Sequence, residues 1–408
     1  MRGTRYLPVL ALVAAGTFGP ATADAASPPK GACLNPAAGG QTIRQVPWAE
    51  KLLGAERAWP FSTGAGVLVA VVDSGVDNDH PQLAEPGKVL PGYDFIRHWP
   101  YADFDCISHG TAVASIIAAD TESGIGFHGV APGARILPLR VSEAEPDDNG
   151  TGAAVNPKVF ARAIRYAADQ GARVINLSVV MYQDVPAVRA AVRYAQAKGA
   201  LLVAAAGNQH QNTGHDATPY PAAYPGVIGV GAITIDGSRL PQSQIGSYVD
   251  LVAPGGGVLA ATREHGYVYW DGTSFATPFV SGTAALIRAE YPKLSPAQVA
   301  SRLLATADPA PGGPDSTEYG HGVVDPYRAV TESLRGANPA AVQAPLAKPT
   351  PDLAAQHRVA QSRHRAASAG RIVAYALLIA FSVIVLAVVR PFRRRRPTAP
   401  PTTGNWRS

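Results

Sequence analysis

Cysteine is scarce in this sequence. Two of its 408 residues are Cys, which excludes the disulfide-dense scaffold of a small secreted module. Charged residues are also few, at 16%, whereas apolar residues make up 47%, so intrinsic disorder is excluded for most of the chain. A basic surplus is missing from the body, because residues 1–336 carry 24 Lys and Arg against 29 Asp and Glu. An evenly basic surface for nucleic acid is therefore excluded.

The N-terminus has the pattern of a secretory signal peptide. Arg2 and Arg5 precede an apolar run over residues 7–18, and small residues surround Ala23 and Ala25. This pattern predicts cleavage near one of those two alanines, which makes residues 1–25 a signal peptide. An uncleaved N-terminal anchor is the alternative, and the short apolar run disfavours it.

The C-terminal region contains the longest apolar run. Residues 372–389 carry no charge and lie between Arg371 and Arg390, which predicts a transmembrane helix. A buried core helix is the alternative. Four arginines at 393–396 follow the run, so the tail over residues 390–408 is expected in the cytoplasm.

The segment before this span has the composition of a linker. Residues 337–371 are rich in Ala, Pro and Gln and show no apolar period, which predicts an extended tether. Together with the signal peptide, the span and tether predict a single-pass protein of the cell membrane. Its body is expected on the extracytoplasmic side.

Both cysteines fall in the part that the signal peptide would export. Oxidising conditions there let a disulfide persist, so we expect a bridge between Cys33 and Cys106. Two free thiols remain the alternative, because the sequence gives no distance between them. Such a bridge would hold the N-terminal segment beside His109.

The body alternates between strand and helix patterns. Continuous apolar runs are typical of strands buried on both faces of a parallel sheet, and here they cover residues 67–72, 136–139, 174–177, 201–205 and 227–230. Amphipathic helical patterns lie between or after them, at 111–119, 159–169, 185–198 and from Ser295 onward. This alternation predicts an α/β fold with a mostly parallel, doubly wound sheet flanked by helices, as one domain over residues 47–336.

Polar residues end or open several of these patterns. Asp73 ends the first strand, His109 precedes a helix, and Ser274 lies in a small-residue turn before an apolar helix. Taken singly, each is equally explained as a turn or cap residue. In the chain order Asp, His, Ser they match one known arrangement of an activated serine. Asn208 follows another buried strand, and its amide can donate to a developing oxyanion.

The segments around these four residues resemble the motifs of the subtilisin-like serine peptidases over most of residues 47–330. The resemblance implies that Asp73 orients His109, that His109 takes the proton of Ser274, and that Ser274 attacks the peptide carbonyl. It further implies that Asn208 and the backbone N–H of Ser274 stabilise the oxyanion. The implied reaction is peptide-bond hydrolysis through an acyl-enzyme, without a metal or organic cofactor.

The strand sequence that ends at Ser178 resembles the family's substrate-pairing strand. Asn176, Leu177, Ser178 and Val179 are therefore expected to bind an extended peptide. Val179 and Val180 stand where the family has glycine, which suggests a narrower S1 entrance. The end of a core strand is the alternative interpretation, since buried strands are rich in valine anyway.

The residue after the expected nucleophile also departs from the family. Phe275 stands there, whereas the family often has methionine. Methionine oxidises to a polar sulfoxide and phenylalanine does not. This difference predicts tolerance of peroxide.

The layout of the chain narrows the resemblance. A signal peptide, a short Cys-containing extension over residues 26–46, a Pro-rich tether and one C-terminal span are similar to the mycosins, the membrane-anchored subtilisins of actinobacterial type VII secretion systems. Trp48 to Trp59 and Gly320 to Asp325 also resemble that group. The extension, at about twenty residues, is too short for an independently folded inhibitory domain. Ile107 and Ser108 replace the Asp-Gly that is usual before the histidine.

The mycosin resemblance implies two roles. One is an endopeptidase that cleaves selected exported proteins, and the other is a structural stabiliser of the secretion membrane complex, for which proteolysis is dispensable. Every residue expected for catalysis is present, which favours an active enzyme. The expected partners are exported protein or peptide substrates, the membrane and the type VII secretion complex, with no nucleic acid. The sequence leaves open the substrate and whether the extension covers the cleft.

Two polar stretches have no assigned role. Residues Ser142–Lys158 are acidic and without period, which predicts a solvated loop, with a partner or calcium surface as the alternative. His210 and His215 have no Cys or carboxylate at a zinc-site spacing. No metal site is therefore expected.

Overall fold

The computed structural model describes residues 32–144, 155–210, 216–314 and 316–334. The expected signal peptide, tether, transmembrane span and tail, as well as His215, lie outside the described residues. Within the described ranges, no helix combines the length and the apolar character needed to cross a bilayer.

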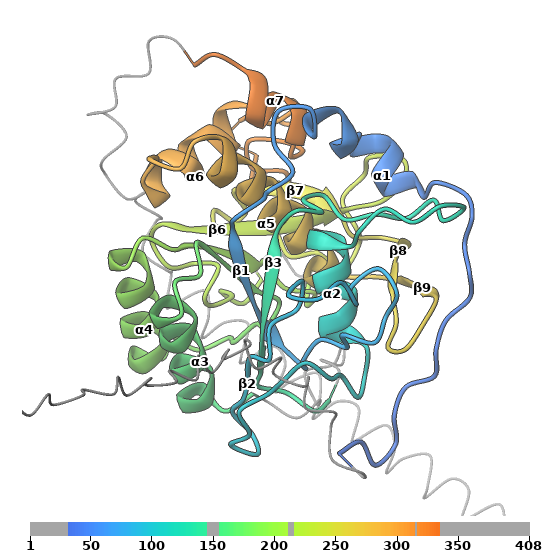
Figure 1. The fold of residues 1–408 in the computed structure, drawn as a ribbon. Helices are drawn as coiled ribbons and strands as arrows, with labels where there is room; N and C mark the ends of the chain where they lie inside the picture. Colours follow the sequence, from blue (N-terminus) through green and yellow to red (C-terminus); the bar gives the residue numbers. More distant parts are fainter. Residues whose placement is uncertain (1–31, 145–154, 211–215, 315, 335–408) are drawn as a thin grey trace, which may run out of the picture.

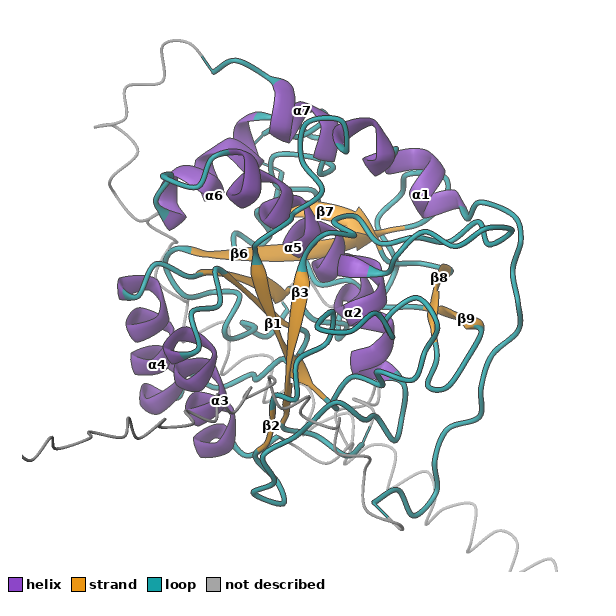
Figure 2. Cartoon of the chain, viewed as in Figure 1, coloured by secondary structure: helices purple, strands orange, loops and turns teal. Residues whose placement is uncertain are grey.

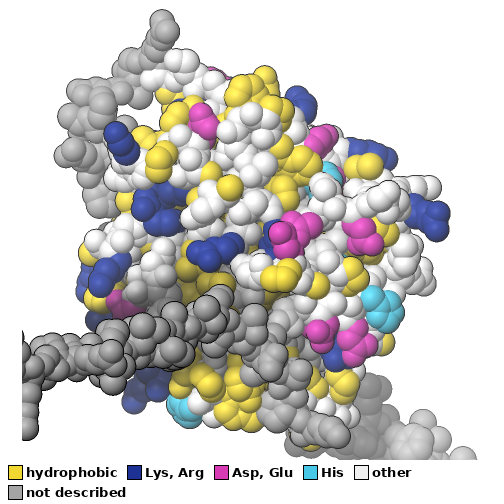
Figure 3. Space-filling view, viewed as in Figure 1, with side chains coloured by type: hydrophobic (Ala, Val, Ile, Leu, Met, Phe, Trp, Pro, Cys, Tyr) yellow, Lys and Arg dark blue, Asp and Glu magenta, His cyan; other side chains and the backbone are white. Residues whose placement is uncertain are grey.

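Lys and Arg side chains are interspersed with Asp and Glu on the face shown in Figure 3.

The centre of the structure is a parallel sheet of seven strands, which confirms the expected α/β architecture (Figures 1 and 2). Its order is β2-β3-β1-β4-β5-β6-β7, and every neighbouring pair runs parallel. The strands are β1 (Leu68–Asp73), β2 (Tyr93–Asp94), β3 (Arg135–Arg140), β4 (Val174–Leu177), β5 (Leu201–Ala205), β6 (Val227–Ile233) and β7 (Leu251–Pro254). The sequence patterns did not indicate β7 or β2, the second of which has only two residues.

Successive strand residues enter two separate cores. In β1, Val69 and Val71 pack with α2 (His109–Ala118) and α5 (Thr273–Glu290), whereas Ala70 and Val72 pack with the helices of the other face. That second layer consists of α3 (Pro157–Asp169) and α4 (Pro186–Ala197). Because side chains alternate between the faces of a strand, a sheet covered on both sides needs continuous apolar runs.

Further elements complete the first layer. They are α1 (Trp48–Leu53), the 3₁₀ helix η1 (Ala55–Ala58), α6 (Pro296–Ala305) and α7 (Pro326–Thr331). A two-stranded antiparallel hairpin of β8 (Val258–Ala261) and β9 (Tyr267–Trp270) lies beside α2 (Figure 1). The hairpin was not predicted. Its second strand, β9, ends three residues before α5 begins.

Helix α6 begins with a complete capping box. The Ser295 hydroxyl accepts a hydrogen bond from the backbone N–H of Gln298, and the Gln298 side chain accepts one from the backbone N–H of Ser295. Both bonds satisfy N–H groups that the helix itself leaves unpaired.

Ser295→Ala is expected to lower the free energy of unfolding by about 1 kcal/mol, because it removes an N-cap acceptor. Ser301→Ala, the same change inside α6, is the matched control and should be neutral. Urea denaturation of the full-length variants checks this. Equal losses in both variants would show that the cap contributes nothing.

Candidate active site

The expected catalytic residues lie at the carboxyl edge of the sheet or at helix starts beside it. Asp73 is the last residue of β1, His109 the first of α2, and Ser274 the second of α5. Asn208 follows β5 by three residues. Because all seven strands are parallel, their carboxyl ends share one edge, where open α/β sheets place their ligands.

Asp73 and His109 are in direct contact. Nδ1 of His109 lies 2.7 Å from Oδ1 of Asp73, and the two side chains are 7% and 3% exposed. Backbone N–H of Ser74 donates to the same carboxylate oxygen at 2.8 Å, which fixes the carboxylate. A proton held on Nδ1 gives Nε2 the lone pair that a general base needs.

The first turn of α2 is held by two residues that the sequence analysis missed. The Ser74 hydroxyl accepts from Gly110 N–H at 2.9 Å and donates to Asp105 at 3.0 Å. Asp105 in turn accepts from the N–H and the hydroxyl of Thr111, at 2.9 and 2.8 Å. Burial raises the pKa of the Asp105 carboxyl, while its hydrogen bonds oppose the shift. The helix start, and with it His109, is thereby fixed to the tip of β1.

Two glycines allow close packing at this tip, one against the loop around Phe104 and one between α2 and the strand end. Gly75 has φ +104°, which disfavours other residues, and a Cβ on it would lie 2.0 Å from the carbonyl oxygen of Phe104. A Cβ on Gly110 would lie 2.0 Å from the carbonyl oxygen of Gly75. Both positions exclude a side chain.

Ser274 makes a reciprocal contact with Ser178. The Ser274 hydroxyl donates to the carbonyl of Ser178 at 3.3 Å, and the Ser178 hydroxyl donates to the carbonyl of Ser274 at 2.9 Å. The second bond has a local reason. Pro278 lies four residues after Ser274 inside α5 and has no N–H for that carbonyl. Ser178 supplies the missing donor.

The Asn208 side chain is oriented by Thr273. Its Oδ1 accepts from the backbone N–H and the hydroxyl of Thr273 at 2.8 and 2.9 Å. With the oxygen held there, the NH₂ group faces Gly272, where a Cβ would lie 2.9 Å from Nδ2. An amide donor held beside the start of α5 is suited to stabilise an oxyanion on a carbonyl attacked by Ser274.

Comparison with known proteins agrees with this geometry. A sequence model of the subtilase family matches residues 64–322. The chain belongs to the subtilase family. Mycosin-1 of Mycobacterium tuberculosis is 37% identical over 342 residues, which cover 72% of this chain and 74% of that protein. The thermophilic serine proteinase of Bacillus sp. is 40% identical over 275 residues, and this chain spans 64% of its length.

Solved structures of mycosins have the same fold. One is the structure of MycP1, a serine protease described as an essential component of the type VII (ESX-1) secretion system. It matches with a TM-score of 0.63 and 36% identity, over 73% of this chain and 91% of that chain. MycP1 from Mycobacterium smegmatis matches with a TM-score of 0.65 and 32% identity, over 78% and 92% of the two chains. The resemblance to subtilisin-like peptidases and mycosins is thus confirmed.

The structure narrows the expected peptide-binding segment of this subtilase. Asn176 and Leu177 lie in β4, which pairs with β1 on one side and β5 on the other, so their backbone has no open edge for a substrate. The Asn176 side chain donates to Ser178 Oγ at 2.9 Å and accepts from Ser281 at 2.8 Å, which ties β4 to α5. These two residues are therefore corrected to structural ones. Peptide binding by Ser178 and Val179, beyond the strand, stays a prediction.

Phe275 belongs to an aromatic cluster around the histidine of this subtilase. Its ring centre lies 5.1 Å from that of His109 and 4.9 Å from that of Trp270, on which it stacks. Trp270 is in turn 6.4 Å from His109. Because Phe275 directly follows Ser274, this packing places the first turn of α5 next to the imidazole of His109.

Phe275→Met is expected to become sensitive to peroxide, whereas the wild type keeps most of its activity, because a sulfoxide would place a polar group in this buried cluster. Residual peptidase activity after timed peroxide exposure checks this. Met181→Leu is the control, since Met181 is the other oxidisable methionine of the body. Equal inactivation of the wild type and Phe275→Met would contradict the prediction.

Ser108 occupies a position that favours glycine. It is the N-cap residue of α2 and has φ +68°. Its hydroxyl accepts from the backbone N–H of Arg263, in the turn of the β8–β9 hairpin, at 3.0 Å. The serine that replaces the usual glycine of the mycosins therefore anchors the hairpin to the start of α2.

The expected disulfide is present. Cys33 and Cys106 have an S–S distance of 2.02 Å and a Cα–Cα distance of 5.3 Å. From there the extension follows the hairpin, where Gln41 pairs with Tyr267, and then Ile43 accepts from Gly126 N–H at 3.4 Å (Figure 1). The described part of the extension, residues 32–46, therefore wraps around the domain beside α2 and β9.

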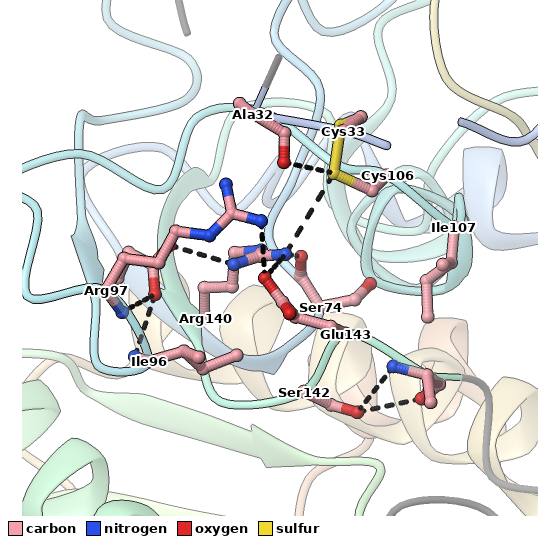
Figure 4. Close-up of polar contacts among 12 residues, drawn as sticks. Ala32, Cys33, Ser74, Ile96, Arg97, Cys106, Ile107, Arg140, Ser142 and Glu143 are labelled. Carbon is pink, nitrogen blue, oxygen red and sulfur yellow. Dashed lines mark hydrogen bonds and ion pairs between the residues drawn. A yellow bond between two sulfur atoms is a disulfide. The ribbon is translucent and has the colours of Figure 1, made fainter. Parts of the chain in front are cut away.

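A buried cation links the disulfide to the tip of β1 (Figure 4). The Arg140 guanidinium is 1% exposed and donates to Asp94 at 2.8 Å and to the carbonyl of Ser74 at 3.0 Å. Its Nη2 also donates to Glu143 at 2.9 Å and lies 4.0 Å from Sγ of Cys106. Arg140 thus joins β1, β2, the disulfide and the first residues of the acidic stretch, most of which lies outside the described residues.

Carboxylates also gather in the loop before Cys106. Asp103 is buried, and its Oδ2 accepts from Asn78 at 3.2 Å, while Oδ1 has no hydrogen-bond partner among the described residues. Burial raises the pKa of Asp103 to about 6, and the charges of Asp79 and Asp77 add to the shift. No group of three or more His, Cys, Asp or Glu in the described ranges is arranged to hold a metal. His210 pairs with Asp216 at 2.9 Å.

Asp103→Asn is expected to raise the free energy of unfolding at pH 7.5 by about 1–2 kcal/mol and to leave it unchanged near pH 4. The pKa of Asp103 is higher in the folded state than in the unfolded state, so the folded protein binds the proton more tightly between about pH 4 and 6. The wild type therefore loses stability as the pH rises through that window, and the uncharged Asn removes this loss. Urea denaturation at both pH values checks this, with exposed Glu122→Gln as the control. A gain that is equal at both pH values would contradict the electrostatic cause.

Proposed function

We propose that this subtilase is a membrane-anchored, extracytoplasmic serine endopeptidase that cleaves selected exported proteins in association with a type VII secretion system. The observation that carries the proposal is the buried contact between Asp73 and His109, next to an α5 start that holds Ser274. The chemistry needs a base, a nucleophile and an oxyanion donor. His109 and Ser274 are the proposed base and nucleophile, and the oriented side-chain amide of Asn208 is the proposed oxyanion donor.

The steps follow from these positions. His109 removes the hydroxyl proton of Ser274 as Oγ attacks the peptide carbonyl, and Asp73 stabilises the imidazolium. Asn208 donates to the tetrahedral oxyanion. His109 then gives the proton to the leaving amine, and the C-terminal half of the substrate departs. Water, activated by His109, hydrolyses the acyl group from Ser274 by the same steps in reverse order.

The secretion role and the location are supported by the relatives and by the sequence. Mycosins match over 70% or more of this chain, and one solved mycosin is described as an essential component of a type VII secretion system. The anchor is supported by the uncharged run at residues 372–389 and the arginines after it. Exported proteins are the expected substrates because the peptidase domain would then face outward.

A fluorophosphonate probe tests the nucleophile in the full-length protein. The wild type and Ser301→Ala are expected to be labelled, whereas Ser274→Ala and His109→Ala are not, since the probe needs an activated serine. Fluorescence of the labelled band measures the reaction. Labelling that persists in Ser274→Ala would place the nucleophile elsewhere.

The same variants separate the two roles of a mycosin in cells. Loss of substrate cleavage with an intact secretion membrane complex in Ser274→Ala would assign proteolysis to Ser274 and leave complex stability to the rest of the protein. An unlabelled, folded wild type with a complex that falls apart only when the whole protein is deleted would favour the structural role and overturn the proposal.

A further inference from the structure

Helices α3 and α4 carry a local excess of positive charge. Residues 155–200, which contain both helices, have seven Lys and Arg against two Asp and Glu. The other residues that the structure describes have 13 Lys and Arg against 22 Asp and Glu. The helix pair is thus a basic part of a body that is otherwise acidic.

The cations of this helix pair are exposed, whereas its apolar side chains are buried. The two helices pack on each other and on one face of the sheet through residues such as Ile164 and Val192. The exposed positions carry cations at helical spacing, namely Lys158, Arg162 and Arg165 in α3 and Arg193 in α4. We call this exposed side of α3 and α4 the basic face.

The charges of the two helices meet around one aromatic ring. The centre of the Tyr194 ring in α4 lies 4.0 Å from Cζ of Arg165 in α3 and 5.4 Å from Nζ of Lys198. The Tyr194 side chain is half-buried, so its ring supports the two cations at the surface. The basic face is therefore continuous across both helices.

Few acids offset these charges. Asp184 forms an ion pair with Arg189, and Asp169 lies 3.4 Å from Nζ of Lys198. The other five cations of residues 155–200 form no ion pair with a described residue. The helix pair therefore presents several positive charges that no described carboxylate pairs with.

The basic face lies on the side of the sheet away from the proposed catalytic helices. Helix α2, which begins with His109, and helix α5, which contains Ser274, pack on the opposite face of the sheet (Figure 2). The catalytic residues lie at the carboxyl edge of the sheet, between the two layers. A flat surface bound to the basic face therefore leaves this edge uncovered.

The proposed anchor keeps the body close to a bilayer. The 37 residues between Leu334 and the apolar run at 372–389 form the predicted tether, and a flexible chain of that length has an end-to-end distance of about 35 Å. Such a tether gives an effective concentration in the millimolar range, so weak contacts are enough for docking. Each Lys or Arg at an anionic lipid surface strengthens binding by about fivefold.

We propose that the basic face docks on a bilayer that contains anionic phospholipids, and that this docking orients the catalytic edge of the anchored peptidase. The inference rests on the membrane anchor in the proposed function. The occupant is a lipid surface because the cations are spread along both helices. The same helices also carry half-buried Tyr166 and Tyr194, a residue type that is enriched at membrane interfaces.

Energy transfer to a headgroup-labelled lipid tests the docking in the full-length protein. A dye is attached to Ala197→Cys, at the end of α4, or to Ser123→Cys, in the turn after α2. Both positions are exposed, and the two native cysteines are bonded to each other, so the dye reacts with the added one.

The position on the basic face is expected to report docking. In vesicles with about 30% phosphatidylglycerol, transfer from position 197 should be about twofold more efficient than from position 123. The two efficiencies should become equal in pure phosphatidylcholine vesicles. They should also become equal in about 0.5 M salt, which screens charges beyond about 4 Å.

Neutralisation of three exposed cations should prevent docking. Arg162→Gln, Arg165→Gln and Arg193→Gln together are expected to lower the ratio of docked to undocked protein about a hundredfold, which equalises the two efficiencies. The matched control makes the same change in net charge at exposed positions elsewhere and should keep the difference, with the substitutions Lys51→Gln, Arg135→Gln and Lys293→Gln.

Two results would overturn the inference and leave the proposed function standing. One is equal efficiency at both positions in anionic vesicles, for a protein that stays in the membrane and reacts with fluorophosphonate. The other is an equal loss in the control variant, because net charge and not the basic face would then decide. A protein that alkaline carbonate washes from the vesicles would overturn the proposed anchor together with the inference.

Two further results would assign the basic face to another occupant. The acidic stretch before α3 is one, and docking that rises several-fold in a variant with Glu145→Gln, Asp147→Asn and Asp148→Asn would identify it. An acidic protein is the other. Binding of polyglutamate by the wild type but not by the triple Arg variant, with equal transfer at both positions, would identify that partner. Either result would overturn docking on lipid.

Discussion

The 2.7 Å contact between Nδ1 of His109 and the Asp73 carboxylate is the interaction on which the rest of the site depends. It joins the end of β1 to the start of α2, and it exists only because the two elements meet closely. Gly110 leaves the space for this approach, and Ser74 bonds the helix to the strand tip. The same contact sets the proton on one imidazole nitrogen, which is what a general base requires.

A second layer of buried polar groups holds this contact in place. Asp105 binds the first turn of α2, and Arg140 ties the carbonyl of Ser74 to the neighbouring strand and to the disulfide region. Charged groups are costly to bury unless they are paired, and each of these has several partners. On the other side, Ser178 replaces the N–H that Pro278 lacks, which holds the Ser274 turn against the end of β4.

The N-terminal extension is part of the same construction. Its disulfide joins Cys33 to Cys106, which lies three residues before His109. The pairing of Gln41 with Tyr267 supports the hairpin that carries Trp270. The hairpin is also bonded to Ser108 through Arg263. The extension therefore supports the hairpin whose Trp270 ring lies 6.4 Å from the His109 ring. This position gives a physical reason for a short, disulfide-held extension in a peptidase domain.

Local apolar patterns predicted five of the seven parallel strands and the main flanking helices, and the motifs gave the residues expected for catalysis, because these are short-range signals. The Cys33–Cys106 bridge followed from a different argument, that the two cysteines both lie in the part expected to be exported. The roles of Asp73, His109, Asn208 and Ser274 stay predictions from that reasoning. Only the tertiary structure decided that Asn176 and Leu177 are structural, since a strand's interior place depends on neighbours distant in sequence. It also decided the hairpin and its pairing with the extension, because the contact of Gln41 with Tyr267 joins segments from opposite ends of the domain.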